Sequence, residues 1–171
     1  MANNKKTPRR LERVFAFNVL YGLCFTPAAS EAELLRAFHL SPDRPDVIKD
    51  EDSFAWSLCF GVWKHREELD RAIADFSQNW RVERMGKVEA TLLRIAMFEL
   101  TRQKEVPPKV AINEAIELSK QFGDDKSRAF INGILDAAAK ALEAARRAEE
   151  DRRIAAPSRE PGEKQPGGFS L

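Results

Sequence analysis

The sequence predicts an all-α protein, and three observations support this fold class. Apolar residues recur three and four positions apart along most of the chain, which is the spacing of one face of an α-helix. Runs of alternating β-branched residues, the signature of strands, are absent. Glycine and proline, which interrupt regular structure, occur at a few separated points and in a cluster after residue 156. With 171 residues, 43% of them hydrophobic, the chain suffices for one compact domain or two small sub-bundles with a shared core.

The first two helices have clear start and stop signals. Proline suits the first turn of a helix and disfavours a helical conformation in the residue before it. The first helix should therefore begin just after Pro8 and end before Pro27. Ser30 followed by Glu33 is a capping-box pattern, which predicts a short second helix over residues 31–40.

Three further helical segments follow a proline-interrupted loop expected at residues 41–47. The segment 53–80 has apolar residues near helical spacing and is interpreted as one long helix or two in tandem. The segment 86–103 is apolar around most of its circumference, which is typical of the central helix of a bundle. Another helix should run over residues 107–122, with Gly123 at its C-terminal cap.

The last predicted helix starts at Asp124 and turns an apolar stripe inward. The inward residues are expected to be Phe130, Ile131, Ile134 and Leu135. Residues 143–171 are expected to form a charged helical extension that frays into a Pro/Gly-rich, disordered tail. At the other end, residues 1–8 are expected to form a flexible basic N-terminus.

Composition and motifs argue against several classes of function. Cys24 and Cys59 lack the neighbours of a zinc site, so both are expected to be reduced core residues. The most apolar run, residues 14–25, is about half the length that crosses a bilayer, so we expect a cytoplasmic protein with no membrane span. No phosphate-cradling glycine loop, nucleophile elbow or metal-ligand spacing occurs. The chain is therefore not expected to be an enzyme or to use a metal or cofactor.

The main functional signal is the basic start of the first helix. Net charge is only +1, so any basic surface must be local. The cations there are Lys5, Lys6, Arg9, Arg10 and Arg13. At about 100° per residue, Arg10, Arg13, Phe17 and Tyr21 share one stripe of the helix. Cations for phosphates and a ring for a base are what a single-stranded nucleic acid requires. The alternative is that both rings belong to the core, Phe17 being the favoured core member, and that the arginines are merely exposed.

Two polar pairs in the last predicted helices are interpreted as structural. Asn113 is expected to be a buried amide that hydrogen-bonds a neighbouring helix or loop, with a ligand contact as the alternative. Glu114 is expected to belong to the same architecture. For Asn132 and Gly133 we expect that the missing side chain lets two helices approach closely.

The segments "RRLERVFAFNVLYGLCF", "GKVEATLLRIAMFEL", "VPPKVAINEAIELSKQFG" and "SRAFINGILD" resemble the NusB family of bacterial transcription antitermination factors. The resemblance runs from about Pro8 to Ala141. It implies a NusB-like fold of two small helical bundles with about seven helices. The NusB-like domain would span residues 9–142, with sub-bundles over about 9–80 and 81–142.

The same resemblance implies a function and partners. Members of the family bind the boxA element of ribosomal RNA leader transcripts together with NusE, a ribosomal small-subunit protein. The pair joins RNA polymerase with NusA and NusG and suppresses premature termination. The family's arginine-rich N-terminus matches Arg9, Arg10 and Arg13, and its two aromatic residues fall on Tyr21 and Phe130.

The start of the last helix offers a physical reason for RNA binding near Phe130. Free backbone N–H groups and the positive end of the helix dipole favour phosphate, and Lys126 and Arg128 add charge. Ala129 departs from relatives, which often carry a basic residue there. A core role for Phe130 is the alternative. The predicted RNA-binding residues are Lys5, Lys6, Arg9, Arg10, Arg13, Tyr21, Lys126, Arg128 and Phe130.

Two other functions stay open at this point. One is a NusB-like RNA-binding module that acts with a ribosomal RNA methyltransferase, because the domain also occurs fused to such enzymes. The other is a protein-binding helical scaffold with no RNA contact. An exposed apolar face could be buried by a partner or in a homodimer, and the pattern does not separate these.

Overall fold

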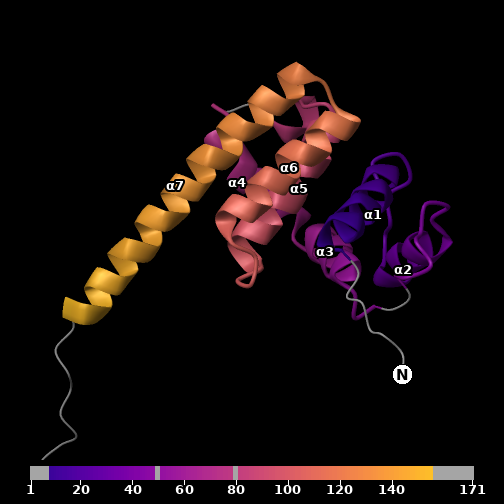
Figure 1. Cartoon of the computed structure of the whole chain (residues 1–171), viewed down its shortest axis with the longest axis horizontal. Coiled ribbons are helices and arrows are strands. Elements are labelled where there is room, and N and C mark those ends of the chain that lie inside the picture. Colours follow the sequence, from indigo (N-terminus) through magenta and orange to yellow (C-terminus); the bar gives the residue numbers. More distant parts are fainter. Residues whose placement is uncertain (1–7, 49–50, 79–80, 156–171) are drawn as a thin grey trace, which may run out of the picture.

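The computed structural model describes residues 8–48, 51–78 and 81–155, and the regular elements in these ranges are all helical. They are α1 (Arg9–Gly22), α2 (Glu31–Leu40), α3 (Phe54–Lys64), α4 (Arg66–Phe76), the short 3-10 helix η1 (Val82–Arg84), α5 (Lys87–Arg102), α6 (Pro108–Phe122) and α7 (Asp125–Ala155). The all-α prediction is confirmed (Figure 1).

The cap of α2 forms as its sequence predicts. The Ser30 hydroxyl accepts a hydrogen bond from the Glu33 backbone N–H at 3.3 Å. In return the Glu33 carboxylate accepts from the backbone N–H of Ala29 at 2.7 Å, one residue earlier than in the usual capping box. The cap thus provides side-chain partners for the backbone N–H groups of Glu33 and Ala29.

The segment after residue 53 is two helices in tandem, because the chain leaves the helical region at His65 (φ −106°, ψ 19°). The break lets the two helices pack against different neighbours. α3 packs against α1, α2 and α5, whereas α4 packs mainly against α5 and α7. The boundary expected near residue 80 therefore does not coincide with the packing, since α4 lies with the later helices (Figure 1).

α5 is the central helix, as predicted. All of its residues from 90 to 100 are buried, and it packs against α1, α3, α4, α6 and α7. A close approach of α3 depends on Gly61. A β-carbon there would lie 2.0 Å from Cζ of Phe98 on α5, so only glycine fits.

α7 continues as one helix through Ala155. Its first half packs on the body, and its second half projects away from it (Figure 1). Ile131, Ile134 and Leu135 point inward as expected, whereas Phe130 is only partly buried. Glu143 and Arg147 form an ion pair on the projecting part.

Both cysteines are free, and Cys59 is buried, which raises the pKa of its thiol. Cys24 is partly buried, with its Sγ 3.6 Å from the Thr91 hydroxyl. Within the described ranges, no helix combines the length and the apolar character needed to cross a membrane.

Candidate nucleic-acid interface

The basic start of α1 is largely tied into the fold. The Arg10 guanidinium donates two hydrogen bonds to Glu114 on α6, at 3.0 and 2.7 Å. The Arg10 side chain nevertheless stays 57% exposed. The hydrogen bonds from Arg10 lower the pKa of Glu114, so this carboxylate is firmly ionised at neutral pH. Glu114 therefore connects α6 to α1.

Arg13 differs from the sequence-based expectation. Only 3% of it is exposed, and its guanidinium donates two hydrogen bonds of 2.8 Å to Glu99 on α5. Burial raises the pKa of Glu99, and the hydrogen bonds from Arg13 oppose that rise. Arg13 is thus the counter-ion of a buried carboxylate, and its guanidinium is directed into the protein interior.

Glu12, the lone acid among these cations, also has a structural partner. It is buried, and its carboxylate accepts the backbone N–H of Ala55 at 3.0 Å, in the first turn of α3. A negative group is favourable at this end of a helix. The sequence alone indicates no role for Glu12, because its partner is 43 residues away.

Arg9 is the remaining described cation of the group. It is exposed, with its guanidinium carbon 4.2 Å from the centre of the Phe54 ring. Such a contact leaves the N–H groups at the edge of the guanidinium free to meet a phosphate. Lys5 and Lys6 lie outside the described residues.

Four rings form a continuous series at the C-terminal end of α1, which we call the aromatic row: Phe122, Phe17, Tyr21 and Phe25. Phe17 stacks on Phe122 with 4.2 Å between ring centres and on Tyr21 with 5.6 Å. Tyr21 meets Phe25 edge to face at 5.3 Å. Phe17 is buried as expected, Tyr21 is partly buried and Phe25 is exposed. The contact with Phe122 joins α1 to the end of α6, where α7 begins.

Phe130, on α7, stands between two hollows. One, of about 490 Å³, is also lined by Arg84, Glu89, Asp124 and Lys126, with Met85, Gly86 and Ser127. The other, of about 420 Å³, is formed with Phe76, Ser77, Gln78, Ala129, Gly133, Ile134 and Ala137. The ring is partly buried and packs against the core, so one part of it is structural and another part borders open space.

The start of α7 is already capped by the chain itself. The Asp124 carboxylate accepts the backbone N–H of Ser127 at 2.8 Å, which lowers the pKa of Asp124. Arg128 pairs with Asp125 at 2.6 Å. The Asp124 carboxylate therefore occupies the Ser127 N–H, one of the groups that were expected to be free for a phosphate. Lys126 is exposed and keeps its place as a candidate cation.

Three residues expected to be structural differ from prediction. Asn113 is exposed on α6 and makes no side-chain hydrogen bond among the described residues, so it is not a buried amide. Asn132 and Gly133 are also exposed. A β-carbon at Gly133 would meet nothing within 4 Å, so this glycine is not required by helix packing. Helical spacing placed these residues on helices but did not identify which face is covered.

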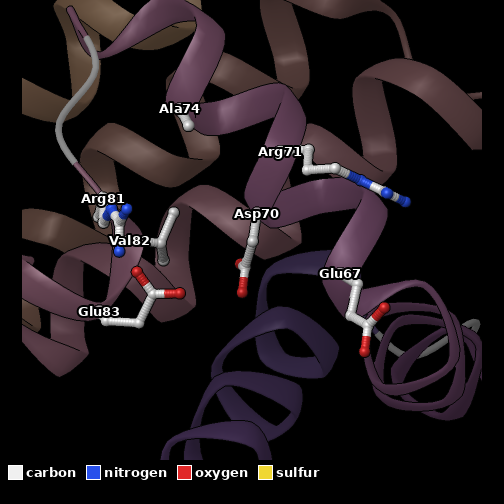
Figure 2. Close-up of a pocket in the computed structure, with 7 residues that line it drawn as sticks. All are labelled: Glu67, Asp70, Arg71, Ala74, Arg81, Val82 and Glu83. Atoms are coloured by element: carbon white, nitrogen blue, oxygen red, sulfur yellow. The ribbon is translucent and has the colours of Figure 1, made fainter.

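A separate cleft of about 330 Å³ lies between α4 and η1. It is lined by Glu67, Asp70, Arg71, Ala74, Arg81, Val82 and Glu83. Figure 2 shows Glu67 and Arg71 pointing away from Glu83. Asp70 is already held by Arg94, at 2.7 and 2.9 Å. The charges are mixed in sign, and no cluster of metal-binding side chains occurs in the part of the chain that the structure describes.

Comparison with known proteins finds relatives and solved structures similar to this chain. Residues 10–140 match the NusB family. The transcription antitermination protein NusB of Nitratidesulfovibrio vulgaris (strain DSM 19637 / Miyazaki F) is 57% identical over 159 residues, covering 85% of this chain and 96% of the relative. T. maritima NusB has a similar structure, with a TM-score of 0.66 and 29% identity over 79% of this chain and 92% of that chain. A chain in the complex of NusB and NusE with double-stranded RNA gives a TM-score of 0.64 at 28% identity, over 78% and 96%.

Proposed function

The chain belongs to the NusB family of transcription antitermination proteins, and on this premise we propose that it binds RNA together with NusE. The proposed RNA is the boxA element of ribosomal RNA leader transcripts. With NusA and NusG, the resulting complex helps RNA polymerase resist termination in the cytoplasm. No catalytic step is part of this function.

The contact between Phe17 and Phe122 is the observation that carries the proposal. These residues are on α1 and α6, and their rings stack at 4.2 Å. Because Phe122 is the last residue of α6, the contact brings the end of α1 to the corner where α7 begins. Tyr21 on one side of this corner, and Lys126 and Phe130 on the other, therefore belong to one end of the molecule. Rings for bases and cations for phosphates are the components of a single-strand binding surface.

The predicted cations are not equally available to RNA. Arg9 and Lys126 are exposed, and Arg10 is exposed although it binds Glu114, whereas Arg13 is buried and Arg128 is partly buried and paired with Asp125. If the first three each neutralise one phosphate, log K should fall with log salt at a slope of about −2, at about 0.7 per phosphate for a single strand. Lys5 and Lys6 would steepen this slope.

The test is a fluorescence-anisotropy titration of the purified chain with labelled boxA RNA. A scrambled RNA of equal length and a double-stranded version of boxA serve as controls, and each titration is repeated with NusE. The duplex arm is included because the similar solved complex contains double-stranded RNA. We expect single-stranded boxA to bind most tightly and NusE to strengthen that binding further.

Two results would contradict the proposal. Equal weak binding to boxA and scrambled RNA, with no effect of NusE, would leave only a nonspecific basic surface. Unchanged affinity after replacing Arg9 and Arg10 together with alanine would remove the basic start of α1 from the interface. In the latter case a protein-binding scaffold would become the better interpretation.

A further inference from the structure

Phe25 is an exposed ring held in a defined place. It is 61% exposed, while the other large exposed apolar side chains of the described residues are aliphatic. Its backbone N–H donates to the Gly22 carbonyl at 3.0 Å, and the N–H of Thr26 donates to the same carbonyl at 3.1 Å. The turn after α1 therefore fixes the backbone of Phe25, while its ring stays exposed to solvent.

The ring also belongs to a larger arrangement. Phe25 is the outer member of the aromatic row, edge to face with Tyr21 at 5.3 Å. A single exposed apolar residue needs no explanation, but an exposed ring that continues a row of rings offers an extended stacking surface.

A cation occupies part of that surface. The Lys87 ammonium lies 4.9 Å from the centre of the Phe25 ring, and no carboxylate pairs with it within 4 Å among the described residues. Lys87 is the first residue of α5, where the helix dipole adds positive potential. Glu89, the acid in the same turn, accepts a hydrogen bond from the Ser127 hydroxyl and so is engaged towards α7.

We propose that Phe25 and Lys87 form a further base-binding position, at which a nucleobase of single-stranded RNA stacks on Phe25 and the Lys87 ammonium moves from the ring to a phosphate of the same strand. The inference rests on the RNA-binding function proposed above. It adds two residues to the interface and extends it beyond Tyr21, across the turn that follows α1.

Replacement of the Lys87 ammonium by a nucleobase on the Phe25 ring is favourable. A cation–π contact at an exposed site changes an equilibrium by a factor of about two to five. Stacking of a base on an aromatic side chain contributes a factor of about five to more than a hundred. The flexible four-carbon stem of lysine lets the ammonium leave the ring without moving α5, and a phosphate is a stronger partner for it than a ring.

The same geometry fits a nucleic acid better than an apolar protein segment. An apolar partner would bury the Lys87 ammonium beside the ring without an anion, which is unfavourable. An RNA strand brings a ring and an anion together at each nucleotide, so it satisfies Phe25 and Lys87 at once. A protein contact is kept as an outcome of the test.

The experiment uses anisotropy with boxA RNA on the full chain and on matched pairs of variants. F25L removes the ring but keeps an apolar side chain, and F25W restores a ring. K87Q removes the charge. The chain provides controls of the same chemistry on α3, where the Lys64 ammonium lies 5.4 Å from the centre of the Phe60 ring outside the aromatic row. F60L and K64Q are those controls.

F25L should weaken boxA binding about fivefold or more, while F25W stays within about twofold of wild type. K87Q should make the salt slope shallower by about 0.7, the value of one phosphate contact. F60L and K64Q should match wild type. Because Tyr21 is the only tyrosine, a 3-fluorotyrosine label gives one ¹⁹F signal beside Phe25. RNA should shift this signal.

The outcomes separate this inference from the function on which it rests. If wild type binds boxA and loses affinity with R9A/R10A, but F25L and K87Q bind like wild type, the Phe25 position is wrong and the general function stands. If wild type fails to bind boxA selectively, both are wrong. Loss of NusE binding in F25L with unchanged RNA affinity would make Phe25 a protein contact and overturn the inference.

Discussion

At its N-terminal end α1 carries charged side chains whose partners lie on other helices, whereas at its C-terminal end it carries rings that reach solvent. Arg10 and Arg13 bind carboxylates of α6 and α5 there, at 2.7 and 2.8 Å. Tyr21 and Phe25 contact each other edge to face, and the Lys87 ammonium lies 4.9 Å from the centre of the Phe25 ring. The N-terminal end of α1 carries more charge, and its charged side chains are mostly used in contacts within the fold.

This difference shows that a basic cluster in a sequence combines two kinds of residue. A cation with a buried carboxylate partner stabilises the packing of helices, because an unpaired buried charge is costly. A cation without such a partner is available to a ligand. The two are neighbours along α1 and cannot be told apart by charge or spacing alone.

The largest expected effect comes from breaking the structural end of α1. R13M leaves the Glu99 carboxylate buried without its counter-ion, and we expect the free energy of unfolding to fall by about 3–5 kcal/mol. Urea denaturation measures this loss. The double variant R13M/E99L, which removes both charges, should recover most of it. A loss below about 1 kcal/mol would contradict the structural role and return Arg13 to the RNA-binding set.

The same variant should show a defined pH dependence. The pKa of Glu99 is already raised by burial, and loss of Arg13 raises it further. A carboxyl group whose pKa is higher in the folded state favours folding when protonated. Stability is therefore greatest at low pH and is lost as pH rises through the folded pKa. The deficit of R13M relative to wild type should be larger at pH 8 than at pH 5.

The next effect tests Tyr21, at the C-terminal end of α1, and Phe130, near the start of α7. Y21L and F130L should each weaken boxA binding by about 1–3 kcal/mol, since each removes a ring on which a base can stack. Anisotropy gives the affinities, and thermal melting separates binding from stability, because both rings are partly buried. Y21F keeps the ring and should bind like wild type. Equal losses in Y21F and Y21L would point to the hydroxyl instead of stacking.

A smaller effect extends the comparison to α7. Gly133 lies inside α7 and is exposed to solvent. A β-carbon added to it would meet nothing within 4 Å. G133A should therefore stabilise the protein by about 0.5–1 kcal/mol, the usual gain of alanine over glycine in a helix. Melting temperature is the measurement. A decrease would show that the position is crowded, and a loss of RNA affinity without a change in stability would make Gly133 part of the interface.

The smallest effect concerns Arg10, which is paired with a carboxylate and is also exposed to solvent. E114Q removes the carboxylate that holds Arg10 and leaves its guanidinium free for a phosphate. If Arg10 does not contact RNA in wild type, the salt slope of RNA binding should steepen by about 0.7 in E114Q. An unchanged slope would mean that Arg10 already reaches a phosphate while bound to Glu114, or that it never does. R10Q resolves these two cases.

Acidification provides a check on the same contact. Arg10 lowers the pKa of Glu114, so the stability that this contact contributes is present above the unfolded-state pKa and is lost as pH falls through the lowered value. A protonated Glu114 resembles glutamine in charge. Wild type and E114Q should therefore converge in stability as pH falls through that range, and a constant difference would contradict the assigned pairing.

The sequence by itself determined the helices and the family. Pro8, the Ser30–Glu33 cap, Gly123 and the apolar spacing of α5 act within a few residues of chain, so their effects can be read without a fold. The block around α6 and the start of α7 is distinctive enough to identify NusB relatives. Local signals of this kind also placed Tyr21 and Phe130 on the correct helices.

Tertiary structure decided which of these side chains remain available. Arg13 and Glu99 are 86 residues apart and Arg10 and Glu114 are 104 apart, so no local pattern reveals either pair. Helical period likewise places Asn113 on a face without saying whether another helix covers that face, and the structure leaves it exposed. Phe25 looked like the end of an apolar run, yet its ring reaches solvent beside Lys87. The physical reason is that caps and periodicity are local, whereas burial and charge pairing depend on which helices meet.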